Sequence, residues 1–174
     1  LEREGHGKNP ALGVVRGPRL PRSVPKALSQ TETDDLLHAM DRGTETTPDW
    51  ISARDSAVLL LLYGCGLRIS EALALNVADV QREGSLTVTG KGGKTRMLPL
   101  LPVVGEALDS YLSKCPHAIA PNGPLFVGVR GGRLGPRVVQ KRVQELRLAL
   151  GLPRETTPHA MRHSFATHLL SAGA

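Results

Sequence analysis

The sequence predicts an α+β fold that is mostly α, in which a small antiparallel β-hairpin or sheet packs on helices. From residue 28 onward, apolar side chains recur mainly at helical spacing. Between residues 85 and 100 the period changes to the alternation typical of paired strands. With 174 residues, of which 40% are hydrophobic, the chain is long enough for one domain with its own core.

The first part of the chain differs from the rest in composition. Residues 9–26 read NPALGVVRGPRLPRSVPK, and their proline, glycine and basic residues resist helix formation and favour an extended connector. We expect an interdomain linker there. Its arginines can either stay solvated or lie along a phosphate backbone. The expected domain then covers residues 28–174.

The first helix is expected in LSQTETDDLLHAMDRG. Ser29 and Glu32 can form a capping box at its start, and Gly43 can end it. The expected inward-facing side chains are Leu36, Leu37 and Met40.

A second helix is expected over residues 52–62. Gly64 and Gly66 interrupt it, and a short helix restarts near Ile69. Arg68 is therefore expected at a junction between two helices.

The segment SLTVTGKGGKTRMLPL is the expected hairpin. Leu86 and Val88 alternate with threonines, and residues 95–98 form the returning strand around a glycine-rich turn. Lys91 is expected at its tip. The tip is not a phosphate-binding P-loop, because Val88 stands where that motif needs glycine and a strand follows where it needs a helix.

The remaining elements are three helices and a short strand. We expect a helix over residues 102–114, a strand near residues 125–127, a helix beginning at Pro136 and a last helix beginning near Pro158. The apolar face of the helix that begins at Pro136 comprises Val139, Val143, Leu146 and Leu150. In the last helix the expected core stripe is Phe165, Leu169 and Leu170, with His163 and His168 as packing or surface residues.

Charge and cysteine usage restrict the class of protein. The chain has 22 Lys and Arg against 16 Asp and Glu, a net charge of +6, which favours a polyanionic partner such as nucleic acid. Many other basic proteins share this balance. Cys65 and Cys115 fit neither a CxxC metal site nor a disulfide framework, so a reducing cytosol is expected. No apolar run approaches the roughly 20 residues that span a bilayer.

His159 and Arg162 are the first candidates for chemistry. They are three residues apart, so both lie on one side of the last helix near its N-terminus, where backbone N–H groups favour an anion. An arginine fork can bind two oxygens of one phosphate. The alternative is that Arg162 pairs with a carboxylate and His159 caps the helix. A zinc site on His159 and His163 is disfavoured, because Ala160 stands where a zinc hydrolase carries its Glu.

Arg68 and Lys91 are the other two candidates. Arg68 precedes Glu71, which indicates a partly buried guanidinium whose orientation a carboxylate fixes, or else a purely structural ion pair. Lys91 can contact a bound phosphate or belong to a solvated turn. Each residue alone is weak evidence for a phosphate-binding site.

Together, YGCGLRISEALAL, GKGGKTRMLPL and PHAMRHSFATHLLSAGA resemble the catalytic domain of tyrosine recombinases, most closely the Xer-type site-specific recombinases that resolve chromosome dimers. The resemblance covers residues 28–174. Residues 1–27 resemble the tail of the family's core-binding, DNA-binding domain and the interdomain linker.

The resemblance implies an activity. A tyrosine hydroxyl attacks the scissile DNA phosphate, which leaves a 3′-phosphotyrosyl link and a free 5′-hydroxyl. Arg68 and Arg162 would stabilise charge on the non-bridging oxygens, Lys91 would protonate the departing 5′ oxygen, and His159 would assist proton transfer at the nucleophile. No cofactor and no metal ion is implied. The implied partners are double-stranded DNA and further recombinase subunits in a tetramer, in the cytoplasm and without a membrane.

The nucleophile itself is not expected in this sequence. In the family, a second His or Trp and then the tyrosine follow the helix that SFATHLLSAGA resembles, and the sequence ends at Ala174 before both. Tyr63 and Tyr111 are expected to be core residues, so this truncated stretch is expected to bind phosphate without cleaving DNA. The alternatives are a phage or transposon integrase of the same family, and a non-catalytic DNA-binding module.

Overall fold

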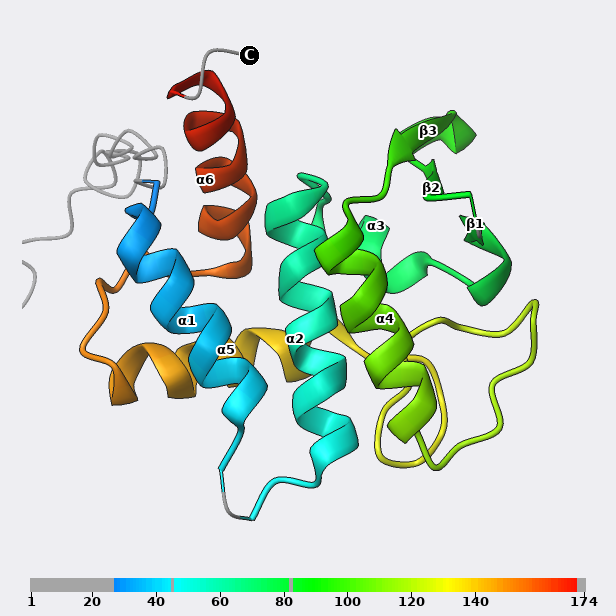
Figure 1. The fold of residues 1–174 in the computed structure, drawn as a ribbon, viewed down its shortest axis with the longest axis horizontal. Helices are drawn as coiled ribbons and strands as arrows, with labels where there is room; N and C mark the ends of the chain where they lie inside the picture. Colours follow the sequence, from blue (N-terminus) through cyan, green and yellow to red (C-terminus); the bar gives the residue numbers. More distant parts are fainter. Residues whose placement is uncertain (1–26, 45, 82, 172–174) are drawn as a thin grey trace, which may run out of the picture.

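The computed structural model describes residues 27–44, 46–81 and 83–171 (Figure 1). The expected linker over residues 9–26 lies outside them. The described helices are α1 Gln30–Arg42, α2 Asp49–Gly64, α3 Ile69–Ala74, α4 Pro102–Lys114, α5 Pro136–Ala149 and α6 Pro158–Ser171. The strands are β1 Val80–Gln81, β2 Ser85–Thr89 and β3 Thr95–Pro99. The predicted fold class, mostly α with a small antiparallel sheet, is confirmed.

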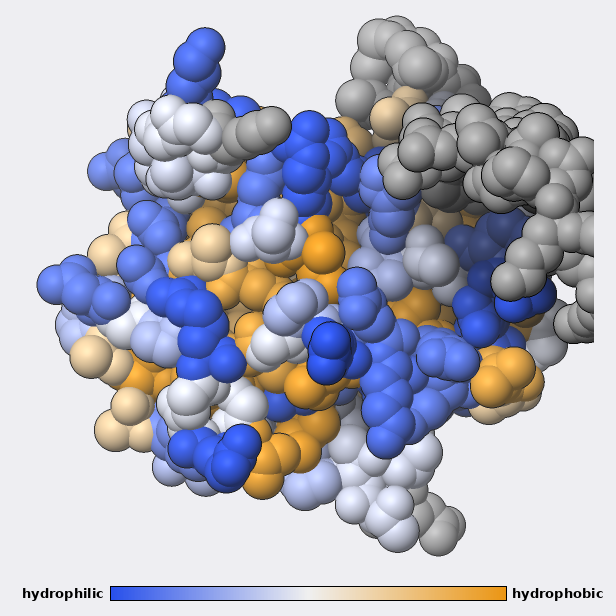
Figure 2. Space-filling view, turned by 180° about the vertical axis from the view of Figure 1, so that it is seen from behind, coloured by the Kyte–Doolittle hydropathy of each residue, from blue (hydrophilic) through white to orange (hydrophobic). Residues whose placement is uncertain are grey.

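Helix α2 is the centre of the domain. Its residues are buried on all sides, as expected for a helix that other elements surround, and it packs against α1, α4 and α6. In Figure 1, α1 and α6 lie on one side of α2, and α4 with the sheet lies on the other. Seen from behind, hydrophilic and hydrophobic residues both lie on the surface (Figure 2). In the described part of the chain, no helix is long and apolar enough to cross a membrane.

The start of α1 follows the sequence prediction. The Glu32 N–H donates to Ser29 Oγ at 3.2 Å, and the Ser29 N–H donates to Glu32 Oε2 at 2.7 Å, which completes the capping box. Gly43 ends the helix with a positive φ of 62°. Leu36 and Met40 are fully buried, and Leu37 is half-buried against the core.

The sheet has the order β1-β2-β3, and both pairs are antiparallel. Leu86 and Val88, which alternate with threonines as the sequence shows, are fully buried, and Val88 pairs directly with Arg96 of β3. Strand β1 was not predicted, because two residues are too few to show an alternating pattern.

Three expectations were wrong. Residues 125–127 form no strand, because isolated bridges such as Val127↔Arg133 are their only ladder contacts among the described residues. Leu150 does not continue the buried face of α5, since the helix ends there at a turn with Gly151 at φ 63°, and the side chain is 37% exposed. Helix α2 begins at Asp49, directly after Pro48, rather than at Ser52.

The buried side of α6 also differs from the expected stripe. Ala160, Met161 and Ser164 are the fully buried residues at its start, whereas Phe165 is half-buried. The side chains of Leu169 and Leu170 lie outside the described part.

Candidate active site

A buried carboxylate organises the junction between α2 and α3. The side chain of Glu71, in the first turn of α3, is only 5% exposed. Its Oε2 accepts the backbone N–H of Arg68 at 2.9 Å, as in the acidic half of a capping box. Its Oε1 accepts Nη1 of Arg68 at 2.9 Å. Glu71 therefore both begins the helix and orients the Arg68 guanidinium.

A second arginine reaches the same carboxylate from β3. Arg96 donates Nη2 to Oε2 of Glu71 at 3.0 Å and Nη1 to Oε1 at 3.3 Å. Burial by itself raises the pKa of the Glu71 carboxyl, but the hydrogen bonds from Arg96 and Arg68 outweigh it and lower that pKa to about 2. The carboxylate is therefore ionised at every physiological pH.

The exposure of Arg68 differs from what the sequence predicts. The Arg68 side chain is 58% exposed, so the expected partly buried guanidinium is wrong, although its orientation by a carboxylate is confirmed. The reason is local: the chain turns at Gly66, the neighbouring Leu67 takes the buried position, and Arg68 precedes α3 at the surface.

Arg162 of α6 joins the same cluster. Its pKa is lowered, first by partial burial and then by the positive charges of Arg68 and Arg96, while Glu71 acts in the opposite direction. No ion pair among the described residues joins Arg162 to a carboxylate, so the structural alternative considered for Arg162 is not what this domain shows. Three guanidinium groups against one carboxylate leave an excess of two positive charges.

A glycine at the α2–α3 junction allows α6 to pack close to the arginine cluster. A Cβ placed on Gly66 would lie 2.7 Å from Cδ1 of Phe165, which is closer than real side chains approach, and Gly66 has a positive φ of 59°. The ring of Phe165 therefore packs directly on the backbone of the α2–α3 junction. Arg162, about one turn earlier in the same helix, is near enough to Arg68 for the charge of Arg68 to lower the Arg162 pKa.

His159 is exposed in the first turn of α6. It does not cap the helix, because Thr157 Oγ1 accepts the Ala160 N–H at 3.1 Å. Together with Ile69 and with Gln140, Gln144 and Arg147 of α5, His159 lines a hollow of about 380 Å³. Since Ile69 follows Arg68 directly, this hollow adjoins the arginine cluster.

Lys91 opens the turn Lys91–Gly93 between β2 and β3, at the tip where the sequence places it. The turn is closed by the Gly90 N–H, which donates to Lys94 O at 2.8 Å. The Lys91 side chain lies outside the described part. A second hollow, of about 490 Å³, is lined by Arg68, Ser70, Glu71, Thr89 and Gly90, so the arginine cluster and the start of this turn border one space.

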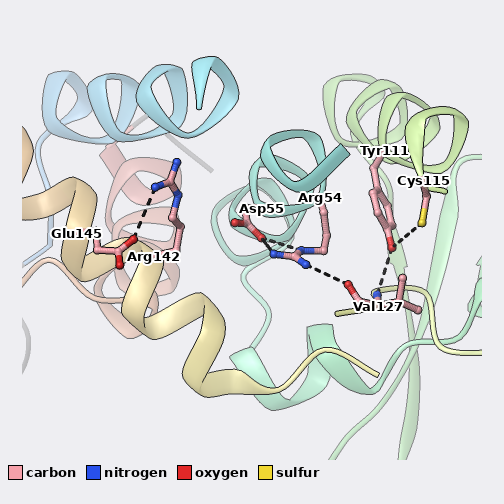
Figure 3. Close-up of polar contacts among 7 residues, drawn as sticks. All are labelled: Arg54, Asp55, Tyr111, Cys115, Val127, Arg142 and Glu145. Atoms are coloured by element: carbon pink, nitrogen blue, oxygen red, sulfur yellow. Dashed lines mark hydrogen bonds and ion pairs between the residues drawn. The ribbon is translucent and has the colours of Figure 1, made fainter. Parts of the chain in front are cut away.

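The hydroxyl groups of Tyr63 and Tyr111 are both hydrogen-bonded within the domain. Tyr111 is fully buried, as predicted, and its hydroxyl oxygen accepts the Val127 N–H at 3.2 Å (Figure 3). Burial raises its pKa. Tyr63 packs against the core but is only half-buried, so it lies at the edge of the core rather than inside it.

The Tyr63 hydroxyl lies 2.9 Å from Nδ1 of His168, and Nε2 of that histidine donates to Leu28 O at 3.0 Å. The Leu28 N–H in turn donates to the buried Ser164 Oγ at 2.8 Å. His168 and Ser164 of α6 therefore hold both backbone polar groups of Leu28, at the start of the described chain.

Sequence reasoning missed Arg96. Its signal was present, because Arg96 is the cross-strand partner of Val88 and so shares the inward face of the hairpin. A charge on that face requires a buried partner, which is Glu71. Among the described residues, no three His, Cys, Asp or Glu side chains are grouped so that they could hold a metal ion.

Comparison with known proteins gives a consistent result. The model of the "Phage integrase family" matches residues 26–174. Tyrosine recombinase XerC of Methylobacterium sp. (strain 4-46) is 56% identical over 173 residues, which are 98% of this chain and 54% of that protein. The chain thus spans about half the length of the relatives that it matches.

Solved structures agree on the fold. A crystal structure of XerA recombinase matches with a TM-score of 0.72 and 28% identity, over 91% of this chain and 54% of that one. A XerH site-specific recombinase bound to its difH substrate, in a pre-cleavage complex, matches with a TM-score of 0.72 and 27% identity, over 86% of this chain and 44% of that one.

Proposed function

Because the chain belongs to the phage integrase family, we propose that it is part of a Xer-type tyrosine recombinase. Such an enzyme cuts and rejoins DNA at specific sites through a 3′-phosphotyrosyl intermediate, and its proposed role is the resolution of chromosome dimers before cell division. Residues 28–174 would be most of the catalytic domain, and residues 1–27 the end of a DNA-binding domain with its linker. The observation that carries this proposal is the solvent-open arginine cluster around Glu71.

The cluster suits a phosphate that gains negative charge during reaction. Arg68 uses one side-chain donor on Glu71, so its other N–H groups stay free for a ligand, and its 58% exposure makes them accessible. Arg162 adds a second guanidinium, whose charge Glu71 offsets in part. Each well-placed donor is worth about 3 to 4 kcal/mol in the transition state of other enzymes.

Two further residues would handle protons. Lys91, at the turn that borders the same hollow as Arg68, would protonate the departing 5′ oxygen. His159, exposed beside the cluster, would assist proton transfer at the nucleophile. The tyrosine and the second His or Trp would lie beyond residue 174, because both tyrosine hydroxyls of the chain are engaged inside the domain.

Helix α5 would extend the contact with the duplex. Gln140, Gln144 and Arg147 of this helix line the His159 hollow, and amide and guanidinium groups of this kind bind phosphates and base edges. The proposed partners are therefore double-stranded DNA and further recombinase subunits, which together form a tetramer on two duplexes. The proposed place of action is the cytoplasm.

The test is a covalent adduct. The uninterrupted polypeptide that contains this chain would be incubated with nicked duplex targets in the presence of chelator, denatured, and examined for a protein–DNA adduct. Arg162→Ala and the 174-residue chain would be run in parallel. We expect an adduct that requires Arg162 and that the 174-residue chain does not form.

The other outcomes separate the alternatives. Salt-dependent binding without an adduct on any target would favour a non-catalytic DNA-binding module. Activity that chelator abolishes would favour a metal-dependent hydrolase. An adduct on the attachment sites of a mobile element, and not on chromosomal sites, would favour a phage or transposon integrase.

A further inference from the structure

The Glu71 carboxylate joins two elements that carry different parts of the proposed chemistry. Arg68 precedes α3 and would bind the non-bridging oxygens, whereas Arg96 belongs to the hairpin whose turn carries Lys91. In the described part of the chain, the four hydrogen bonds to this carboxylate come from these two arginines. The relative position of α3 and the hairpin is therefore set at one buried acid.

Arg96 is placed to control the turn. It binds both oxygens of Glu71, a geometry that fixes the plane of its guanidinium and not only its distance. Its partner in the ladder is Val88, which lies two residues before Gly90. Arg96 itself lies five residues after Lys91. Because the Gly90 N–H closes the turn on Lys94 O, holding Arg96 holds the base of that turn.

Gly90 shows how closely the turn lies on this ion pair. A Cβ at that position would be 3.3 Å from Nη1 of Arg96 and 3.7 Å from Oε1 of Glu71. Its φ of −93° is one that any residue adopts, so backbone conformation does not require glycine here. The close approach of the Arg96 guanidinium leaves little room for a side chain, so a larger residue would have to displace it.

We propose that Arg96 is a positioning residue for the general acid: through Glu71 it holds the β2–β3 turn, and with it Lys91, in register with Arg68. The same carboxylate would then align the donor for the departing oxygen and the donor for the non-bridging oxygens on one phosphate. This inference rests on the proposed function. A misplacement of about 1 Å can cost on the order of a hundredfold in rate.

The cleavage step offers a test that separates the two donors. The tyrosine hydroxyl gives up its proton with the assistance of His159, and its oxygen bonds to phosphorus. The P–O5′ bond breaks, and its electron pair stays on the 5′ oxygen, which takes a proton from the Lys91 ammonium. If sulfur replaces that bridging oxygen, the leaving group is a thiolate, which is stable without the proton because thiols have a pKa of about 8.5. A variant in which Lys91 is misplaced should then cleave the sulfur-bridged substrate at the normal rate. A variant that binds the phosphate poorly should cleave it slowly.

The experiment uses the uninterrupted polypeptide with oxygen-bridged and 5′-sulfur-bridged versions of one target. We expect Arg96→Met to cleave the oxygen substrate at least about tenfold more slowly, and the sulfur substrate within about threefold of the wild type. Lys91→Ala is the reference for rescue by sulfur, and Arg42→Met, an exposed arginine at the end of α1, is the matched control for loss of one positive charge.

Two further variants keep the inference testable if Arg96→Met does not fold. Gly90→Val leaves Arg96 in place but displaces its guanidinium, and should give the same slow cleavage with rescue by sulfur. Arg96→Lys keeps the charge but cannot bind both oxygens in a fork, so its rate should fall between those of Arg96→Met and the wild type.

Unchanged cleavage of the oxygen substrate by Arg96→Met would overturn the inference, as would slow cleavage that sulfur does not rescue, because Arg96 would then act on the phosphate or through Arg68. If the wild type forms no adduct with either substrate, the proposed function fails and the inference fails with it.

Discussion

The domain contains two arginine–carboxylate clusters that look alike in sequence and differ in three dimensions. In α2, Nη2 of Arg54 lies 2.6 Å from Oδ1 of Asp55, and the two side chains are only 2% and 4% exposed (Figure 3). At the start of α3, Glu71 is equally buried, but the side chains of Arg68 and Arg96 are 58% and 40% exposed. One cluster is closed and the other is open.

The clusters also differ in how their charges are used. Arg54 donates to Asp55 and to Val127 O at 3.1 Å, and its guanidinium lies 5.4 Å from the centre of the Trp50 ring. Its charge is matched by one carboxylate, and burial raises the pKa of Asp55 even though Arg54 opposes this. A closed pair of this kind connects elements of the core.

The open cluster has more cations than its carboxylate can neutralise. With Arg162 beside Arg68 and Arg96, the excess positive charge faces solvent, where a polyanion can reach it. A buried arginine whose charge one buried carboxylate balances therefore indicates a structural role here. A buried carboxylate with several exposed arginines indicates a binding role. Substitutions in the two clusters should separate these roles.

The largest expected effect is on the closed pair. Arg54→Ala leaves Asp55 buried without its partner, which should lower the free energy of unfolding by about 3 to 5 kcal/mol. Urea titration of the chain measures it. The double variant Arg54→Ala/Asp55→Ala should recover part of this loss, because the unpaired charge is gone. A loss below about 1 kcal/mol would mean that the pair is not structural.

The docking of α6 should come next. Gly66→Ala places a methyl group against the Phe165 ring at a positive φ, and should cost about 2 to 3 kcal/mol in unfolding free energy. Gly92→Ala is the matched control, because Gly92 also has a positive φ, of 80°, but no atom within 4 Å of its would-be Cβ. It should cost only about 1 kcal/mol. Equal losses for the two variants would show that Phe165 does not hold α6 in place.

Glu71 should give a smaller effect that depends on pH. Its folded-state pKa of about 2 lies below the ordinary value of 4.5, so ionised Glu71 stabilises the domain above about pH 4.5, and this stabilisation is lost as pH falls toward 2. Glu71→Gln should therefore cost about 1 to 3 kcal/mol near neutral pH, at 1.36 kcal/mol per pKa unit reduced by solvent screening of the exposed arginines. The difference between the two proteins should vanish near pH 2. Urea titrations across this range measure it, and a difference that stays constant with pH would contradict the ion-pair account.

Local patterns explain what the sequence could predict. The helices, the hairpin and the capping box at Ser29 depend on neighbours within a few residues, and their spacing is visible in the chain. The candidates Arg68, Lys91, His159 and Arg162 came from motifs of the same local kind. Their catalytic roles stay predictions.

Contacts between distant segments explain what the sequence could not predict. Arg96 and Glu71 are 25 residues apart in the chain, so nothing local shows that they share a salt bridge. The same holds for Tyr63, whose partner His168 is 105 residues away.

The smallest expected change in stability, for Arg68→Ala, is the sharpest test of the comparison. An exposed guanidinium contributes about 0 to 1 kcal/mol to folding, so the urea midpoint should barely move. Its loss should instead appear in DNA binding. If Arg68 neutralises one phosphate, the slope of log affinity against log salt should fall by about 0.9 relative to the wild type, measured by fluorescence anisotropy with a duplex. Arg42→Ala, exposed at the end of α1, should change neither quantity. If Arg68→Ala were as destabilising as Arg54→Ala and left the salt slope unchanged, the open cluster would be structural like the closed one, and exposure would not distinguish the two.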